Sequence, residues 1–408
     1  MLSFEKACEA VQQYWRKLKA PQQEPVSISE ALGRVLAEPI LADRDFPPYP
    51  RATRDGYAVR AADIQSAPST LRIIGQIKAG ASSRAAIKSG EAVEIMTGAA
   101  VPPGADAVVM VEYTKHIGER VEVLRAASVG ENIVAQGSEA RAGDELLPPG
   151  KRLDFAPIAV AAAVGKTILD VYRKPRVSIL STGDELVDLA AVPALHQIRN
   201  SNSYSLAAQV TLAGGEAVQL PVAADEKPAL TALIQQGLSS DLLLLSGGVS
   251  MGQFDLVEQV LADLGARFVF TGAEIQPGKP VVFGEVPCGK DKSATPFFGL
   301  PGNPVSTMVT FDLFVRPVVQ ALAGAIPVRL PTAKARLARE IKTKTGLTRF
   351  LPATLRGDLY EPEVEFVPWQ GSGDIAAVAR ANCYVIVPPD RDRIGAGEMV
   401  SILLRSAS

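Results

Sequence analysis

The sequence has few of the side chains from which disulfide frameworks and zinc sites are built. Its 408 residues include three cysteines, Cys8, Cys288 and Cys383, and two histidines, His116 and His196, all far apart along the chain. A disulfide framework needs several paired cysteines, and a structural zinc site needs four clustered ligands. Neither is expected here. A reducing cytoplasm is the expected compartment, and any bound metal must be held by oxygen atoms.

The chain also lacks a strong net charge and a long apolar run. Lysine and arginine number 42 against 44 aspartates and glutamates, so no bulk field draws the protein to nucleic acid or to an anionic membrane. The most apolar stretch, residues 155–165, contains Pro157 and is far shorter than the roughly 20 residues that span a bilayer. It predicts a buried helix. Charges among the first ten residues argue against a secretory signal.

Changes of pattern along the chain predict several domains, since a chain this long exceeds one ordinary core. Helical periodicity covers about residues 3–19 and returns at 153–164, and Ser27 to Glu30 has the spacing of a capping box that begins a second helix. Short alternating runs broken by Gly and Pro indicate β structure elsewhere. The expected domains are helical (1–42 with 140–175), a β-rich insert (43–139), α/β (176–326) and a small C-terminal β domain (327–408).

The α/β domain is expected to have three layers around a mostly parallel sheet. Strands are predicted at residues 176–180, 216–222, 241–246, 281–284 and 297–300, with helices between most of them. This alternation favours a parallel sheet covered by helices on both faces. The whole chain is therefore predicted to be a multidomain α/β and β protein.

Three of these strands lead into small, polar or glycine-bearing turns. The turns are S-T-G-D-E-L at 181–186, S-G-G-V-S-M-G-Q-F-D at 246–255 and P-G-N-P-V-S at 301–306. Ligands of α/β sheets bind beyond the carboxyl ends of the strands. Glycine permits close backbone approach there, and a following helix N-terminus attracts anions. Each turn alone is more simply a tight connection, but the three together favour an anion site. The sequence has no G-x-x-x-x-G-K-[ST] phosphate loop.

Acidic residues accompany these turns. Asp184, Glu185, Asp225 and Asp255 fall at or just after predicted strand ends, and two unpaired carboxylates about 4 Å apart would repel by roughly 4 kcal/mol at an effective dielectric of 20. A Mg²⁺ ion bridging to phosphate would relieve that repulsion. Each acid alone is more simply a helix cap. Lys279, held between prolines in P-G-K-P, suits an oxyanion, although a solvated surface lysine remains the default.

Taken in chain order, these motifs resemble those of the molybdopterin molybdenumtransferase family, the MoeA type, also represented by the C-terminal region of gephyrin. The matching stretches are D-G-Y-A-V at 55–59, I-M-T-G-A-A-V-P-P-G-A-D-A-V-V at 95–109, G-E-N-I at 130–133, P-R-V-S-I-L-S-T-G-D-E-L at 175–186, S-G-G-V-S-M-G-Q-F-D at 246–255, P-G-K-P at 277–280, G-L-P-G-N-P-V-S at 299–306 and Q-G-S at 370–372. Each is weak alone, but together they span nearly the whole chain.

The resemblance implies an elongated homodimer of four-domain subunits. The active site would lie between the α/β and C-terminal domains of one subunit and the insert of its partner. There, molybdenum from molybdate would enter the dithiolene of adenylylated molybdopterin with the help of Mg²⁺, releasing AMP and forming molybdenum cofactor. A molybdopterin adenylyltransferase and apo molybdoenzymes become possible protein partners.

The resemblance also implies roles for particular residues. Catalytic roles would fall to Asp55, Thr97, Glu185, Asp255 and Lys279, and the metal ligands would be Asp184, Glu185, Asp225 and Asp255. Substrate contacts would come from Thr182, Gly183, Ser246, Gly247, Gly248, Ser250, Pro301, Gly302, Asn303, Pro304 and Ser372.

The sequence departs from the family pattern in a few places. Gln276 stands where the family commonly has a lysine, and hydrogen bonds to charged groups contribute roughly 1.5 to 3 kcal/mol. Arg51 or Arg54 could compensate for that loss, or tungstate could be preferred to molybdate. Two interpretations from other classes stay open: a cofactor-binding or scaffold protein without catalysis, and the adenylyltransferase step itself. The insert and the C-terminal domain argue against the latter.

Overall fold

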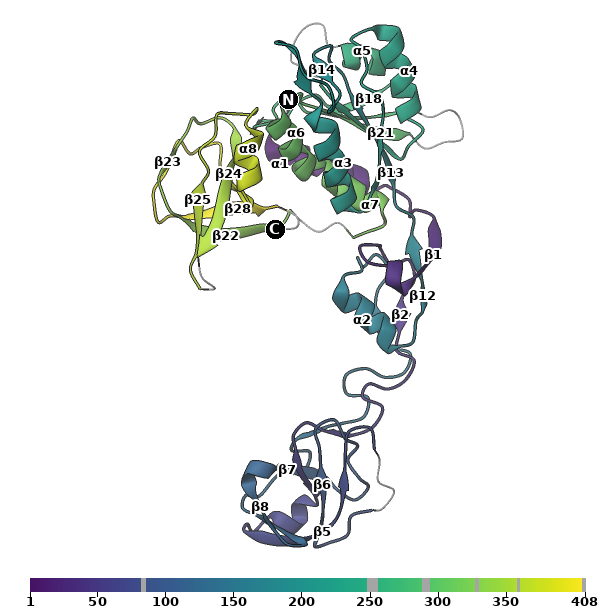
Figure 1. Cartoon of the computed structure of the whole chain (residues 1–408), viewed down its shortest axis with the longest axis vertical. Coiled ribbons are helices and arrows are strands. Elements are labelled where there is room, and N and C mark those ends of the chain that lie inside the picture. Colours follow the sequence, from purple (N-terminus) through teal and green to yellow (C-terminus); the bar gives the residue numbers. More distant parts are fainter. Residues whose placement is uncertain (82–85, 248–255, 288–293, 327–329, 358–359, 406–408) are drawn as a thin grey trace.

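The computed structural model describes residues 1–408 apart from 82–85, 248–255, 288–293, 327–329, 358–359 and 406–408. Figure 1 shows an elongated molecule with an α/β unit and a C-terminal β unit side by side at one end. A slender middle unit connects them to a β-rich insert at the opposite end. The multidomain α/β and β fold expected from the sequence is confirmed.

The α/β unit is built on a six-stranded sheet of order β16-β13-β17-β21-β20-β18. The first four strands in this order are parallel, and β20 runs antiparallel to both of its neighbours. The mostly parallel sheet is thus confirmed, with β18 added to the predicted strands. The strands are β13 (Arg176–Ser181), β16 (Glu216–Gln219), β17 (Leu242–Ser246), β18 (Arg267–Phe270), β20 (Val282–Val286) and β21 (Thr295–Leu300).

Helices cover both faces of this sheet because its central strands are apolar on both sides. In β17, Leu242 and Leu244 face one core, while Leu243 and Leu245 face the other, since side chains alternate along a strand. A strand buried on both faces needs no polar alternation. The first core includes helices α1 (Phe4–Trp15), α3 (Ser201–Ala213), α6 (Pro304–Thr310) and α7 (Arg316–Leu322), and the second includes α4 (Lys227–Gly237) and α5 (Leu256–Asp263).

The N-terminal segment differs from its prediction in two ways. Helix α1 packs through Ala7 and Val11 into the α/β core rather than into the middle unit. The second helix expected from Ser27 is wrong, because Gln23–Ser27 is strand β1, paired with β12 (Ile168–Tyr172), and only the 3-10 turn Ile28–Glu30 follows. No α-helix follows Ser27 because its side chain makes no capping hydrogen bond and the chain after it turns to distant partners: the Gly33 amide donates to the Leu153 carbonyl, and Leu36 bridges Val171.

The middle unit joins β1 and β12 to a second strand pair and to helix α2. The pair is β2 (Ile40–Leu41) with β11 (Glu145–Leu147), and α2 spans Phe155–Ala163. The helix predicted here is present, but only one side of it is covered: Pro157 is buried, whereas Phe155 is 84% exposed.

The insert is a six-stranded sheet of order β7-β4-β6-β5-β9-β8, with one apolar core on each side. A further short pair, β3 with β10, lies beside it. The strands are β3 (Arg51–Ala52), β4 (Gly56–Val59), β5 (Ser69–Ile77), β6 (Glu91–Ile95), β7 (Ala107–Met110), β8 (Thr114–Ile117), β9 (Arg120–Val123) and β10 (Ile133–Val134).

The C-terminal unit is a sheet that closes on itself, because β24 pairs with β26 as well as with β25. A strand from the α/β region, β19 (Ile275–Gln276), joins this sheet beside β24 and so ties the two units together. The other elements are β22 (Thr332–Leu337), β23 (Ile341–Lys342), β24 (Thr348–Gly357), β25 (Pro362–Phe366), α8 (Ile375–Arg380), β26 (Cys383–Val387), β27 (Arg393–Ile394) and β28 (Met399–Leu404).

In the described part of the chain, one helical run, Pro304–Leu322, is long and apolar enough to cross a membrane by the criteria of length and composition alone. It comprises α6, a π-helical turn and α7. In the fold, 72% of its most apolar window is buried, and its side chains belong to the first core of the α/β unit. Packing in that core accounts for its apolar character.

Candidate functional site

Strands β13, β17 and β21 end side by side at one edge of the α/β sheet. The Thr182 amide, just after β13, donates to the Ser246 carbonyl of β17 (3.1 Å), and the Gly247 amide donates to the Leu300 carbonyl of β21 (3.3 Å). The three turns that the sequence singled out are therefore neighbours. Of the predicted substrate-binding residues, this edge brings together Thr182, Gly183, Ser246, Gly247, Pro301, Gly302, Asn303 and Pro304.

The β17 turn needs a glycine at its first position. Gly247 has a φ of +90°, and a Cβ atom there would lie 2.5 Å from the Thr182 carbonyl oxygen, closer than any non-bonded contact allows. Gly302 approaches the same turn less tightly, because its Cβ would lie 3.6 Å from the Gly247 Cα atom. The backbones of the three turns thus converge without intervening side chains at these positions.

Asn202, in the first turn of α3, fastens two of these turns together. Its Nδ2 donates to the Ser246 hydroxyl (2.9 Å) and to the Gly302 carbonyl (2.8 Å). Its Oδ1 is buried and has no hydrogen-bond partner among the described residues. Asn202 was not among the predicted site residues, since Asn-Ser-Asn before a helix indicates only capping, and the cap is in fact Asn200. Nothing in the local pattern identifies its contacts with distant turns.

The predicted metal ligands are placed unevenly. The Asp184 carboxylate accepts from the Asp225 amide (3.2 Å), and the Asp225 carboxylate accepts from the Thr182 hydroxyl (2.5 Å), so these two acids are close neighbours beside the β13 turn. The Glu185 carboxylate lies against Gly183. Asp255, like Gly248 and Ser250, falls outside the described residues. Within the described ranges, no three His, Cys, Asp or Glu side chains are grouped to hold a metal.

The P-G-N-P turn connects the glycine turns to the C-terminal unit. The Val305 amide at the start of α6 donates to the Ser372 carbonyl (3.0 Å), which places the Q-G-S segment beside this turn. The Thr307 hydroxyl donates to the Pro301 carbonyl (2.5 Å) and so holds the turn against its own helix. Ser372, which is 68 positions from the next predicted site residue, Pro304, therefore lies beside this turn.

The P-G-K-P loop lies where the α/β and C-terminal units meet. Gln276 pairs with Arg349 in the β19–β24 ladder, and the Arg349 Nε donates to the Gln276 Oε1 (2.8 Å). Arg349 is 6% exposed and also donates to the Lys344 and Leu347 carbonyls. Burial lowers the pKa of its guanidinium, which remains charged at neutral pH. The half-buried Lys279 follows in the same loop.

Arg349 places a positive charge beside Gln276, the residue that stands where the family commonly has a lysine. Arg51 and Arg54 were the predicted sources of a replacement charge, but Arg51 forms an ion pair with Glu139 (2.7 Å) within the insert. The cation beside Gln276 is instead Arg349. No sequence signal joins positions 276 and 349, because their contact arises when a strand of one unit completes the sheet of another.

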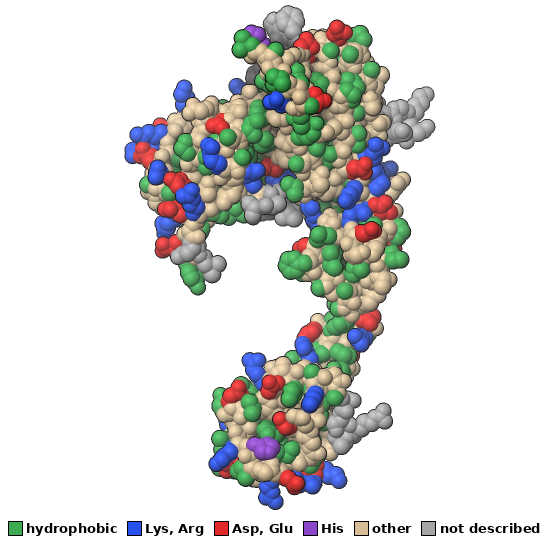
Figure 2. Space-filling model, in the orientation of Figure 1, with side chains coloured by type: hydrophobic (Ala, Val, Ile, Leu, Met, Phe, Trp, Pro, Cys, Tyr) green, Lys and Arg blue, Asp and Glu red, His purple; other side chains and the backbone are tan. Residues whose placement is uncertain are grey.

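Asp55 and Thr97 form a pair in the insert. The Thr97 amide (2.7 Å) and hydroxyl (2.8 Å) both donate to the Asp55 Oδ1, and these bonds, the backbone one first, lower the pKa of Asp55. Asp55 directly precedes β4 and Thr97 follows β6, and both strands belong to the insert sheet, which lies at the far end of the molecule from the α/β sheet (Figure 1). Figure 2 shows open space between the insert and the upper units. Within one chain, this pair does not join the other site residues.

Comparison with known proteins covers almost the whole chain. Residues 2–165 match the MoeA N-terminal region (domain I and II), residues 178–321 match a domain described as "Probable molybdopterin binding domain", and residues 334–404 match the MoeA C-terminal region (domain IV). A molybdopterin molybdenumtransferase from a Nostoc species is 36% identical over 397 residues, which cover 95% of this chain and 90% of that protein. The chain belongs to the MoeA family.

Other members of the MoeA family agree with this assignment. A molybdopterin molybdenumtransferase from Staphylococcus aureus is 33% identical over 405 residues, covering 97% of this chain and 94% of that protein. Two solved structures of the molybdopterin biosynthesis MoeA protein from Pyrococcus horikoshii cover 99% of this chain. One has a TM-score of 0.80 at 28% identity over 100% of its own length, and the other has 0.72 at 33% over 99%. The resemblance inferred from the motifs is confirmed.

Proposed function

We propose that this chain inserts molybdenum from molybdate into the dithiolene of adenylylated molybdopterin, releasing AMP and forming molybdenum cofactor. Its relatives from Nostoc and Staphylococcus aureus carry the name molybdopterin molybdenumtransferase. The observation that carries the proposal is the convergence of three glycine- and proline-bearing turns with Ser372 at one edge of the sheet. Arg349 lies beside Gln276, directly before the P-G-K-P loop. Such turns suit a pyrophosphate, and buried cations suit a tetrahedral dianion.

The pyrophosphate of the substrate would lie against the strand-end turns. The backbones of the Gly247 and Gly302 turns lie close together, and the N-terminus of the 13-residue helix α3 is held at the same turns through Asn202. The partial positive charge of a helix N-terminus favours an anion there. Gly183, together with Gly248 and Ser250 from the residues that the structure does not describe, would complete this cradle.

Molybdate would bind on the side of the P-G-K-P loop. Lys279 and Arg349 supply positive charge where the two units meet, and Ser372 lies beside the start of α6. Pro301 and Pro304 restrict the backbone between these groups and the phosphate turns. These residues would bind the oxyanion and hold it near the dithiolene, and Arg349 would take the part that a lysine at position 276 plays in other members of the family.

Asp184 and Asp225 would hold Mg²⁺, with Glu185 and Asp255 as further candidates. Two neighbouring carboxylates are a fitting donor set, because Mg²⁺ is commonly bound by one or two carboxylates and by the phosphate oxygens of a substrate. When bound, the ion would neutralise charge on the phosphoanhydride and so make AMP a better leaving group. The carboxylates themselves would fix the position of the β13 turn relative to the pyrophosphate.

A second copy of the chain would complete the site with Asp55 and Thr97. Two observations support a homodimer: this pair lies at the opposite end of its own chain from the α/β sheet, and the middle unit exposes Leu32 (69%), Phe155 (84%) and Ile168 (59%). Inactive Asp55→Ala and Lys279→Ala variants, mixed after reversible dissociation, should regain part of the activity, because one of the two sites in a mixed dimer is intact. A monomer in sedimentation experiments would contradict this arrangement.

The central test is release of AMP by the purified protein with adenylylated molybdopterin and Mg²⁺, measured in parallel with molybdate, tungstate and neither oxyanion. We expect AMP release that depends on molybdate and is abolished by a chelator, and a product that activates an apo molybdoenzyme. Release with tungstate alone would favour the tungstate-preferring alternative. Tight binding of the pterin substrate without any AMP release would reject catalysis and leave the binding-protein alternative.

A further inference from the structure

A pocket of about 290 Å³ lies beside Gln276, and none of the residues that line it belongs to the three strand-end turns. Its aromatic lining residues are Phe366 and Trp369, its apolar ones are Ile341 and Leu351, and Gln276 and Arg349 are among its polar ones. The remaining lining residues are Glu340, Lys342 and Thr343, so the pocket combines apolar and aromatic walls with several polar groups. A concave site of both kinds of group suits a small organic molecule. Two aromatic side chains in so small a volume favour a flat ring system.

The walls of this pocket are held firmly. Trp369 is half-buried and packs against both the α/β core and the C-terminal core, so its ring is fixed where the two units meet. Arg349 is held by Gln276 and by two backbone carbonyls. The pocket therefore exists before any ligand binds, which reduces the entropic cost of binding.

We propose that this pocket holds the pterin ring of the substrate, an inference that rests on the proposed function. Molybdenum enters at the dithiolene, which is attached to the tricyclic pterin, whereas adenine lies at the far end of the pyrophosphate. The ring site must therefore adjoin the oxyanion site. Gln276 and Arg349 satisfy this condition because both line the pocket and both adjoin the P-G-K-P loop. Phe366 and Trp369 supply the aromatic surfaces for contact with the ring.

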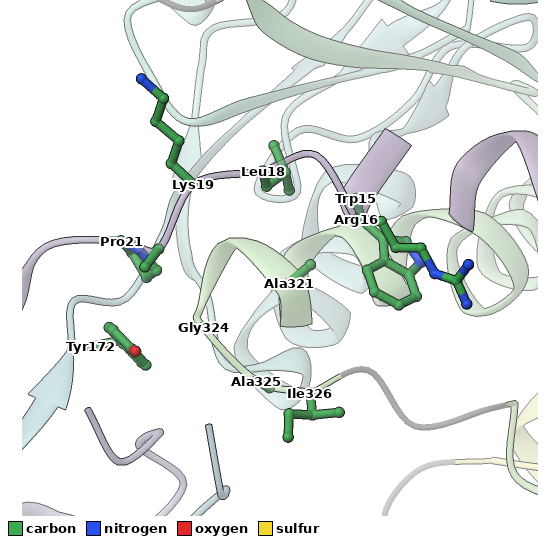
Figure 3. Close-up of a pocket in the computed structure, with 11 residues that line it drawn as sticks. Trp15, Arg16, Leu18, Lys19, Pro21, Tyr172, Ala321, Gly324, Ala325 and Ile326 are labelled. Carbon is green, nitrogen blue, oxygen red and sulfur yellow. The ribbon is translucent and has the colours of Figure 1, made fainter. Parts of the chain in front are cut away.

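The two tryptophans of the chain make this inference directly testable. Trp369 lines the proposed pterin pocket, whereas Trp15 lines a separate pocket of about 360 Å³ between the end of α1, the end of α7 and the middle unit. Figure 3 shows Trp15 with Arg16 on one side of that second pocket and Tyr172 on the other. Each tryptophan thus reports on a different cavity, so single-tryptophan variants distinguish the two by fluorescence.

The experiment titrates molybdopterin, kept anaerobic, into the Trp15→Phe and Trp369→Phe variants, with AMP as a second titrant. We expect molybdopterin to quench Trp369 emission in Trp15→Phe, and AMP to leave it unchanged. In Trp369→Phe, the emission of the remaining Trp15 should fall only because the pterin absorbs light. Subtracting this decrease from the first titration leaves the quenching of Trp369 that is due to binding. Equilibrium dialysis should show binding of molybdopterin by both variants.

Affinity provides the second measurement. Trp369→Ala should weaken molybdopterin binding by about 5- to 150-fold, the usual effect of losing one aromatic stacking partner. Thr343→Tyr, which places a bulky side chain on the wall of the same pocket without removing core packing, should also weaken it, and this variant decides the matter if Trp369→Ala does not fold.

Three results would overturn the inference: quenching of Trp15 instead of Trp369, quenching of Trp369 by AMP, or unchanged affinity in a folded Thr343→Tyr variant. None of these titrations requires turnover. A wild-type protein that binds molybdopterin at Trp369 but releases no AMP would contradict the proposed function alone, and one that releases AMP while Trp369 stays unresponsive would contradict this inference alone.

Discussion

Replacing Asn202 with alanine should separate catalytic positioning from stability. The change removes the hydrogen bonds that join the Ser246 and Gly302 turns, each contributing about 0.5 to 1.5 kcal/mol. It also removes the buried Oδ1 that has no partner among the described residues, which offsets part of the loss. We therefore expect the free energy of unfolding to fall by about 1 to 2 kcal/mol. Activity should fall further, since a displacement of about 1 Å at a reacting centre can cost roughly 100-fold in rate.

Asn200→Ala is the matched control, two residues earlier on the same helix. The Asn200 side chain accepts from the Ser203 amide (3.1 Å) and donates to the Ser203 hydroxyl (2.8 Å), and it also accepts from Ser181 (3.3 Å). Loss of such a cap costs about 0.5 to 2 kcal/mol, a similar range. Its side-chain bonds run to these two serines and not to the Gly247 and Gly302 turns.

Urea denaturation gives the stability of both variants, and the rate of AMP release at saturating substrates gives the turnover. Asn202→Ala should lose about 10- to 100-fold in turnover, while Asn200→Ala, at a comparable loss of stability, should stay within a few-fold of the wild type. If the two variants lose the same fraction of activity for the same loss of stability, Asn202 acts through the fold as a whole and the positioning argument is refuted.

Three further predictions follow from the same geometry. Gly247→Ala should destabilise the protein by about 1 to 3 kcal/mol, because Gly247 has a φ of +90° and the added Cβ would overlap Thr182. Gly302→Ala should leave the stability almost unchanged, since its Cβ would lie 3.6 Å from its nearest neighbour. Thermal denaturation measures both variants. Thr97→Val should raise the pKa of Asp55, because it removes one of the two hydrogen bonds that favour the charged carboxylate and lower its pKa; an NMR titration in which Asp55 protonates at no higher pH than in the Thr97→Ser control would contradict this. Arg349→Met should raise the KM for molybdate by about 10- to 150-fold, the range for a lost charged hydrogen bond, with little change in the affinity for AMP; an unchanged KM would remove Arg349 from the oxyanion site.

The pattern of side chains was sufficient to predict the α/β unit and its glycine turns. Leu242 to Leu245 indicate a strand covered on both faces, and the turns after the strands carry the glycines that close approach requires. The order of motifs along the chain indicated the MoeA family, as the matches over residues 2–165, 178–321 and 334–404 confirm. These features are local in sequence, because strand burial and turn geometry depend on short stretches of residues.

The missed features all depend on contacts between distant segments. The capping-box spacing at Ser27 gave only a 3-10 turn, because the chain after it pairs with distant segments: the Gly33 amide donates to the Leu153 carbonyl, and Leu36 bridges Val171. Helix α1 joined the α/β core, although nothing in its own periodicity distinguishes that core from the middle unit. An amphipathic pattern predicts that one face of a helix is buried, but it does not predict which other element covers that face.

The same distinction holds for the candidate site. Composition and motif order were sufficient to predict oxygen ligands for a metal, anion-binding turns and a lysine that binds an oxyanion, since these follow from residue types and their spacing. The tertiary structure alone decided that Asn202 joins two turns, that Arg349 stands beside Gln276, and that Asp55 and Thr97 lie at the far end of their own chain. Each of these depends on which strands pair and which units pack together, and that choice is made by the free energy of the whole fold rather than by any one segment.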